Sequence, residues 1–190
     1  AKILEASERA ANITTTILAQ ARNRSDSFEP TDLGQIVLDS LVLLEREMRK
    51  YRIAIETQID PATPRVHASG NQIQRVLLNL LINARQSMDE GGTIMIRLGP
   101  GSEPGFVELV VRDTGSGIPR ETLPQIFDAF YTTKSGPDDS GKGGTGLGLA
   151  ACKEIIDAHQ GRIRVESTVG RGTAFIIRLP ESGDQQEAAA

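Results

Sequence analysis

Asp113 ends an apolar run and is followed closely by Gly115 and Gly117, in the sequence LVVRDTGSGIP. Residues without a side chain let a flat group approach the backbone, and a carboxylate at the same place can accept a hydrogen bond from that group. This chemistry suits the amine-bearing edge of a planar ring. A turn in which the aspartate only caps the loop explains the same residues, so the motif alone leaves both interpretations open.

Residues 135–149, SGPDDSGKGGTGLGL, hold six of the nineteen glycines. A glycine-rich stretch that opens into a helix presents backbone N–H groups and the positive end of the helix dipole, which together favour phosphate. The run from Gly136 to Lys142 matches the start of a P-loop, but Gly143 stands where a Ser or Thr would bind Mg²⁺. No strand precedes GTGLG, and the βαβ unit of a dinucleotide-binding fold is missing. We therefore predict a phosphate site of another kind.

Asn79 and Asn83 lie four residues apart in the segment 71–88, NQIQRVLLNLLINARQSM. Apolar residues recur three and four positions apart in this segment, which predicts an amphipathic helix with one buried stripe. The two amides share a face beside that stripe, at positions where charged side chains would stabilise the helix more than asparagine does. Taken alone, this window is equally well explained by asparagines that are solvated or bonded to their own backbone.

Five motifs occur together in one order: the asparagine helix, DTGSG, IFDAFYTTK at 126–134, GGTGLGL at 143–149 and GRGTAF at 170–175. Over about residues 31–180 they resemble the boxes of sensor histidine kinases, especially the branch that includes nitrogen-regulatory sensor kinases. The resemblance implies the Bergerat ATP-binding fold, which gyrase, a heat-shock chaperone and the MutL repair proteins share. It also implies a function, transfer of the ATP γ-phosphoryl group to a histidine on a dimerisation helix, for relay to a response regulator.

The resemblance assigns roles to residues. Asn83 matches the amide that holds Mg²⁺, Asn79 is its companion one turn earlier, and Asp113 matches the carboxylate that receives the adenine amino group. A neutral amide oxygen can hold Mg²⁺ while the phosphates supply the charge. An aspartate attracts the amino group of adenine and repels the carbonyl of guanine, so ATP is selected. The other nucleotide contacts implied are Gly115, Gly117, Ile118, Lys142, Gly144, Thr145, Gly146, Leu147, Gly148 and Thr173.

Two further expectations concern the reaction. The segment 132–143, with Lys134 and Lys142, is long and glycine-rich, so we expect it to be mobile without nucleotide and to close over the γ-phosphate as a lid. Relatives that hydrolyse ATP with water carry a glutamate where this chain has Asn79, and an amide cannot accept that proton. Transfer to a protein side chain is therefore favoured, with a clamp-type ATPase and a non-catalytic ATP-binding switch as the alternatives.

The chain also departs from the kinase pattern. Many sensor kinases have Lys and Tyr where this chain has Gln86 and Ser87, which puts phosphate and adenine contacts there in doubt, although Arg85 is adjacent. His67 and His159 are its two histidines, and neither lies in an acceptor motif. We expect both to have structural or surface roles, and we expect this chain to bind ATP without phosphorylating itself.

The order of the elements predicts how the motifs are positioned. Residues 1–24 contain no Gly or Pro and repeat apolar residues at helical spacing, so 1–27 is interpreted as the second helix of a truncated dimerisation hairpin, or alternatively as a helix folded on its own domain. RSDSFEP at 24–30 predicts a linker, 28–181 the catalytic domain, and 182–190 a disordered tail. Within the domain the patterns predict helices near 31–50, 71–88, 121–127 and 146–160, with strands near 51–60, 93–98, 106–112, 162–167 and 174–179. This mixture predicts a two-layer α/β sandwich with a mixed, mainly antiparallel sheet and helices on one face.

Composition narrows the partners. The 190 residues are 38% hydrophobic, enough for one core and a helical appendage, and the net charge of -4 without a basic cluster argues against nucleic acid. No apolar run is long enough to span a membrane. Cys152 has no second cysteine and sits at an apolar helix position, so we expect a buried hydrophobe and a cytoplasmic setting. The chain starts without Met, and we expect a longer, homodimeric parent kinase.

Overall fold

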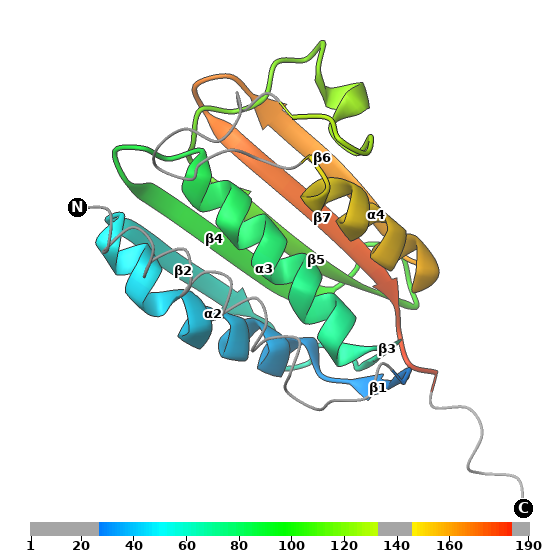
Figure 1. Cartoon of the computed structure of the whole chain (residues 1–190). Coiled ribbons are helices and arrows are strands. Elements are labelled where there is room, and N and C mark those ends of the chain that lie inside the picture. Colours follow the sequence, from blue (N-terminus) through cyan, green and yellow to red (C-terminus); the bar gives the residue numbers. More distant parts are fainter. Residues whose placement is uncertain (1–26, 133–145, 184–190) are drawn as a thin grey trace, which may run out of the picture.

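A computed structural model describes residues 27–132 and 146–183 of the chain. Its main sheet has the strand order β2-β4-β5-β7-β6, and the helices of the described chain cover one face (Figure 1). The first pair is parallel and the other three pairs are antiparallel. The predicted α/β sandwich with a mixed, mainly antiparallel sheet is confirmed. The strands are β2 (Ile53–Ile59), β4 (Gly92–Pro100), β5 (Phe106–Asp113), β6 (Arg162–Thr168) and β7 (Gly172–Pro180).

Two of the described α-helices begin at polar N-caps, and each of the α-helices buries one stripe. In α2 (Leu33–Lys50), the Asp32 carboxylate accepts a hydrogen bond from the Gln35 N–H at 3.2 Å, as expected of an N-cap. Ser69 caps α3 (Gly70–Gln86) in the same way through the Gln72 N–H. The third helix, α4 (Gly148–Ala158), packs beside α3 (Figure 1).

The core lies between the sheet and the layer of helices, with α3 at its centre and the buried stripes of α2 and α4 on either side. The stripe predicted for α3 is buried throughout, as are the alternate residues of the strands that face it. This arrangement fixes α3 over the middle of the sheet, so its C-terminal end lies near the end of β5 where Asp113 stands. The buried hydrophobic residues of α3 and the main sheet are Ile53, Ile73, Val76, Leu77, Leu78, Leu80, Leu81, Ala84, Ile94, Ile96, Leu98, Val107, Leu109, Val111, Phe175, Ile177 and Leu179.

The predicted linker at 24–30 is wrong at its C-terminal end. Glu29–Thr31 forms strand β1, which pairs antiparallel with β3 (Val66–Ala68) in a small second sheet. The Thr31 hydroxyl donates to the Ala68 carbonyl at 2.8 Å. A polar segment ending in Pro resembles a linker because its pairing partner lies far away in the sequence.

Three smaller expectations also change. The helix predicted at 121–127 is a single 3₁₀ turn, η1 (Leu123–Gln125), because Pro124 lacks the N–H that a longer helix needs. The last helix begins at 148 rather than 146, since Gly146 adopts a φ of 68°. In the strand predicted near 51–60, alternation with Ile53 and Ile55 would place Thr57 on the buried face, but Thr57 is exposed. The predicted helix at 1–24 lies outside the described residues. So do residues 133–143 of the lid predicted at 132–143 and residues 184–190 of the tail predicted at 182–190.

Candidate functional site

Asp113 is the last residue of β5, and its side chain is 4% exposed. Its Oδ1 atom accepts hydrogen bonds from the Gly115 N–H at 2.8 Å, the Thr173 N–H at 3.2 Å and the Ser87 hydroxyl at 3.3 Å. No described residue donates to Oδ2. Burial raises the pKa of Asp113, and the hydrogen bonds from Gly115, Thr173 and Ser87 act against that rise. A buried carboxylate with one loaded and one open oxygen can accept a donor from outside the protein.

The glycines around Asp113 allow three chain segments to pack without side chains between them. A Cβ at Gly115 would lie 2.0 Å from the Ser87 hydroxyl oxygen, and one at Gly117 would lie 2.2 Å from the Thr168 carbonyl oxygen. Gly172, which the sequence did not single out as a site residue, would place a Cβ 2.0 Å from the Asp113 carbonyl oxygen. Its φ of 100° also excludes most other residues. These contacts hold the turn after Asp113 against α3 on one side and the β6–β7 turn on the other.

The Thr173 hydroxyl belongs to a hydrogen-bond network next to Asp113. It shares a hydrogen bond of 2.9 Å with the Ser167 hydroxyl, which also accepts from the Ile118 N–H at 2.8 Å. Ser167 was not predicted, because nothing in its local sequence marks it. Thr173 and Ile118 are thus brought to one network, with Thr173 contributing its backbone N–H to the carboxylate and its hydroxyl to Ser167.

The two asparagines are half-buried on a face of α3 beside the apolar stripe. The Asn79 amide donates to the Gly148 carbonyl at 3.4 Å and lies 3.7 Å from the Cys152 sulfur, so it contacts the first turn of α4. No described residue hydrogen-bonds the Asn83 side chain. The described chain also has no cluster of three or more His, Cys, Asp or Glu side chains. A metal held by Asn83 would therefore need the phosphates of a nucleotide as further ligands.

The start of α4 carries the described part of the glycine-rich segment. Gly146 accepts from the Phe130 N–H at 3.0 Å, and a Cβ there would lie 2.4 Å from the Phe130 carbonyl carbon. Leu147 precedes the helix and is 43% exposed, and Gly148 begins it beside Asn79. The remaining predicted contacts, Lys134, Lys142, Gly144 and Thr145, lie outside the described residues.

Arg85 does not contribute to this site. Its side chain is 10% exposed, lies 3.0 Å from the Glu47 carboxylate and is stacked over the Tyr51 ring at 4.6 Å. The guanidinium therefore faces α2. It cannot make the contacts of the Lys and Tyr that many sensor kinases have at the positions of Gln86 and Ser87. Ser87 itself does reach the site, through its bond to Asp113.

Other sequence expectations are met away from the site. Cys152 is fully buried, and burial raises the pKa of its thiol to about 11, so it is a core residue rather than a nucleophile. His159 is buried, with Nδ1 2.7 Å from the Ile155 carbonyl oxygen and Nε2 accepting from the Ser69 N–H at 3.0 Å. His67 is exposed on β3.

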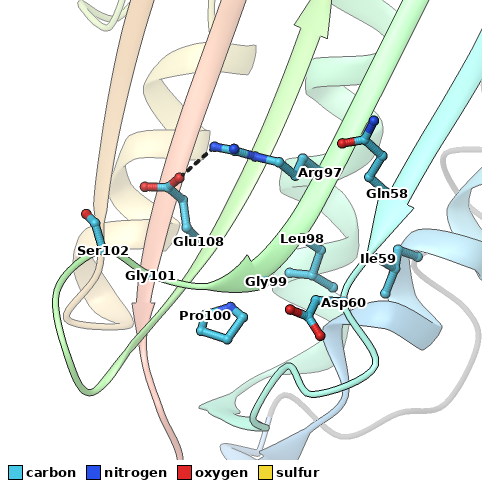
Figure 2. A pocket seen from close by; sticks show the side chains of 10 residues that line it. All are labelled: Gln58, Ile59, Asp60, Arg97, Leu98, Gly99, Pro100, Gly101, Ser102 and Glu108. Carbon is cyan, nitrogen blue, oxygen red and sulfur yellow. Dashed lines mark hydrogen bonds and ion pairs between the residues drawn. The ribbon is translucent and has the colours of Figure 1, made fainter.

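A groove on the described chain lies away from this site. Its volume is about 750 Å³, and it lies at the turn end of β4 and β5, where the Arg97–Glu108 ion pair of 3.1 Å crosses it (Figure 2). No residue predicted to bind nucleotide lines it, and it is open and polar. We place the site at Asp113 because the buried carboxylate and the glycines converge there. The lining residues are Gln58, Ile59, Asp60, Arg97, Leu98, Gly99, Pro100, Gly101, Ser102 and Glu108.

Comparison with known proteins identifies the class. Residues 68–183 match the family model described as histidine kinase-, DNA gyrase B- and HSP90-like ATPase, and this range includes Asn79, Asn83, Asp113 and Thr173. The chain belongs to this ATPase family. No helix in the described part of the chain has the length and apolar character needed to cross a membrane.

The relatives narrow the class to two-component kinases. The chain is 31% identical to the sensor histidine kinase TmoS of Ectopseudomonas mendocina over 96% of its own length and 18% of that protein. It superposes on the catalytic domain of histidine kinase ThkA with a TM-score of 0.70 and 32% identity, covering 82% of this chain and 96% of that one. The structure of ThkA in complex with the response regulator TrrA matches with a TM-score of 0.69 and 30% identity, covering 97% and 51% of the two chains. The chain is thus the ATP-binding domain of a sensor histidine kinase, and it spans about a fifth of the length of TmoS.

Proposed function

We propose that this domain binds Mg·ATP and transfers the γ-phosphoryl group to a histidine on a dimerisation helix of its parent kinase. The observation that carries the proposal is Asp113, whose buried carboxylate keeps Oδ2 open beside glycines that leave room for a flat base. In this arrangement Oδ2 accepts from the adenine amino group. Gly115, Gly117 and Ile118 border the base, and Thr173 supports the carboxylate from behind.

The phosphates extend from the base along α3 toward the start of α4. Asn83 contributes its free amide oxygen to Mg²⁺, which neutralises phosphate charge when bound. Gly146, Leu147 and Gly148 present backbone at the N-terminal end of α4, where the helix dipole favours anions. Lys134, Lys142, Gly144 and Thr145 are proposed to complete the phosphate contacts.

Asn79 supports transfer to a protein rather than to water. Its amide is oriented toward the Gly148 carbonyl, and an amide in that position cannot take a proton from water. In the proposed reaction the acceptor imidazole nitrogen bonds to the γ-phosphorus while the bond to ADP breaks. The domain's task is then to position the nucleotide and neutralise its charge.

The proposed partners are the phosphoacceptor helices of a homodimeric parent and a cytoplasmic response regulator. The complex of the related ThkA with TrrA supports the second of these. Phe130 is 75% exposed, whereas Phe127 packs edge-on against Phe175 at 6.5 Å. Of the two rings, Phe130 is therefore the candidate for contact with the acceptor helices.

The test uses radiolabelled ATP with this chain alone, with the intact dimerisation hairpin of its parent, and with the hairpin's His→Ala variant. We expect ATP binding in every case and acid-labile label on the intact hairpin alone, at a slow rate because the two parts are not tethered. Label on this chain alone would place the acceptor within it. Steady phosphate release without label would indicate a clamp ATPase, and binding with neither outcome would indicate a non-catalytic switch.

A further inference from the structure

Ser87, the C-cap residue that follows α3, contacts the turn after Asp113 through several atoms. Its hydroxyl lies 2.8 Å from the Ala84 carbonyl oxygen and 3.3 Å from Asp113 Oδ1. Its carbonyl accepts from the Ser116 N–H at 3.0 Å, and the missing side chain of Gly115 makes room for its hydroxyl. One hydroxyl hydrogen cannot serve both acceptors fully, so its bond to the carboxylate is the weaker and more easily altered one.

The donors to Asp113 are not equivalent. Gly115 and Thr173 donate from the backbone, so no substitution removes those bonds directly. Ser87 is the side-chain donor among the described residues, and it approaches from a different element, α3. A carboxylate held from two sides at Oδ1 cannot rotate freely about its terminal torsion, and the direction of Oδ2 is thereby set.

We propose that Ser87 is a positioning residue for adenine recognition. Its hydroxyl donates a hydrogen bond to Oδ1 of Asp113 and thereby orients the carboxylate so that Oδ2 faces the amino group of the base. This inference rests on the proposed nucleotide function and adds a residue to it. Where many sensor kinases are expected to have an aromatic side chain against the base, this chain acts through the carboxylate instead. The alternative is that Ser87 serves α3 alone, as the end of the helix.

The test compares ADP with a purine nucleoside diphosphate that lacks the 6-amino group, in calorimetric titrations of the whole chain without Mg²⁺. Ser87→Ala should weaken ADP binding roughly three- to tenfold, the value expected for one hydrogen bond, and should change binding of the analogue less than about twofold. Ser87→Cys keeps the volume but has a weak donor, so it should behave like Ser87→Ala. Ser102→Ala removes a hydroxyl that accepts from Arg178 at the far end of the sheet, and should leave both affinities unchanged.

The pH dependence of ADP binding gives a second readout. The Ser87 hydrogen bond lowers the pKa of Asp113, so its loss should move the acid limit of ADP binding to higher pH. Arg112 is the charged neighbour that also lowers this pKa, and the contacts from α3 and β7 are neutral, so the shift is attributable to Ser87. Equal losses for ADP and the analogue, or a Cys variant that behaves like the parent, would overturn the inference. Failure of the unaltered chain to bind ADP would instead refute the proposed function.

Discussion

At the N-terminal end of α3, the Ser69 N–H donates to a buried histidine, His159, whose other ring nitrogen lies 2.7 Å from the Ile155 carbonyl oxygen. At the C-terminal end, Ser87 and two backbone N–H groups converge on one oxygen of a buried carboxylate, Asp113, and leave the other without a described donor. Both clusters are buried, polar and built from segments far apart in the chain. The two clusters differ in whether the described residues supply a hydrogen-bond partner for every polar atom.

This difference separates a structural cluster from a binding site. Buried polar groups that are fully paired stabilise a fold, whereas a buried acceptor left open costs free energy unless something else pairs with it. The ring nitrogens of His159 are both used, and the Thr31 hydroxyl nearby contacts the Glu29 and Ala68 carbonyls. By contrast, Asp113 Oδ2 and the Asn83 amide have no hydrogen-bond partner among the described residues, and in the proposed function both of them contact the bound nucleotide or its metal. If the two ends of α3 are independent in this way, substitutions at one end should leave the property of the other end unchanged.

The largest effect is expected for Asp113→Asn. The amide oxygen of the asparagine should accept the three hydrogen bonds that Oδ1 accepts now. The amide NH₂ group then faces the adenine amino group, so that two hydrogen-bond donors oppose each other. We expect ADP and ATP affinity to fall by roughly 2–3 kcal/mol, measured by calorimetry. Unchanged affinity would refute the assignment of Asp113 to the base.

The same variant should not destabilise the fold at neutral pH. Burial raises the pKa of Asp113, so the stability linked to its protonated form is present below the unfolded-state pKa and is lost as pH rises through the folded-state pKa. Above the folded-state pKa the ionised carboxylate opposes folding, and asparagine removes that cost. Urea denaturation should give an unfolding free energy equal to or above that of the parent. A marked loss would show that the carboxylate is structural.

At the other end, His159→Ala should reverse this pattern. It removes a buried ring and leaves the Ser69 N–H unpaired, so the unfolding free energy should fall by about 2 kcal/mol. ADP affinity of the folded protein should stay within about twofold. The control is His67→Ala, since His67 is exposed and its loss should cost under about 0.5 kcal/mol. A comparable loss of ADP affinity in His159→Ala would mean that the two ends communicate through α3.

Local patterns account for what the sequence predicted correctly. The stripe of α3, the end of β5 at Asp113 and the burial of Cys152 depend on spacing and residue type within a few positions, and the structure has them as expected. The mixed sheet and its covered face followed from the order of these elements.

The remainder depends on pairings between distant residues. Ser87 and Asp113 are separated by 26 positions, and Ser69 and His159 by 90, so neither bond can be inferred from one sequence. The strand at Glu29–Thr31 was missed for the same reason, since its register with Val66–Ala68 is not local. Arg85 looked available to the site, but its position on the helix turns it toward Glu47 on α2 and toward Tyr51, the C-cap residue of α2.

Asn83→Ala should produce a smaller effect that depends on Mg²⁺. The amide has no described partner, so its removal should leave stability within about 0.5 kcal/mol. Affinity for Mg·ADP should fall by roughly 1–2 kcal/mol, the value of one polar contact to a charged group, while affinity for metal-free ADP is retained. Calorimetric titrations with and without Mg²⁺ measure the affinity for Mg·ADP and the affinity for metal-free ADP separately. Equal losses in both would assign Asn83 to the nucleotide or to folding rather than to the ion.

The smallest effect is expected for Phe28→Ala, which tests whether the N-terminal end is as self-contained as its hydrogen bonds indicate. The Phe28 ring stacks on His159 with centroids 4.4 Å apart and is 42% exposed. Since the histidine already has both hydrogen bonds, the ring adds packing alone, and its loss should lower the unfolding free energy by roughly 0.5–1 kcal/mol. Combining Phe28→Ala with His159→Ala should cost less than the sum of the two, because the stacking can be lost just once. Phe130→Ala is the matched control, since that ring is 75% exposed and should leave stability within about 0.5 kcal/mol. Phe28 immediately precedes β1. A fall in ADP affinity of more than about threefold in Phe28→Ala would show that this segment affects the Asp113 site at the C-terminal end of α3. The two ends of α3 would then not be independent.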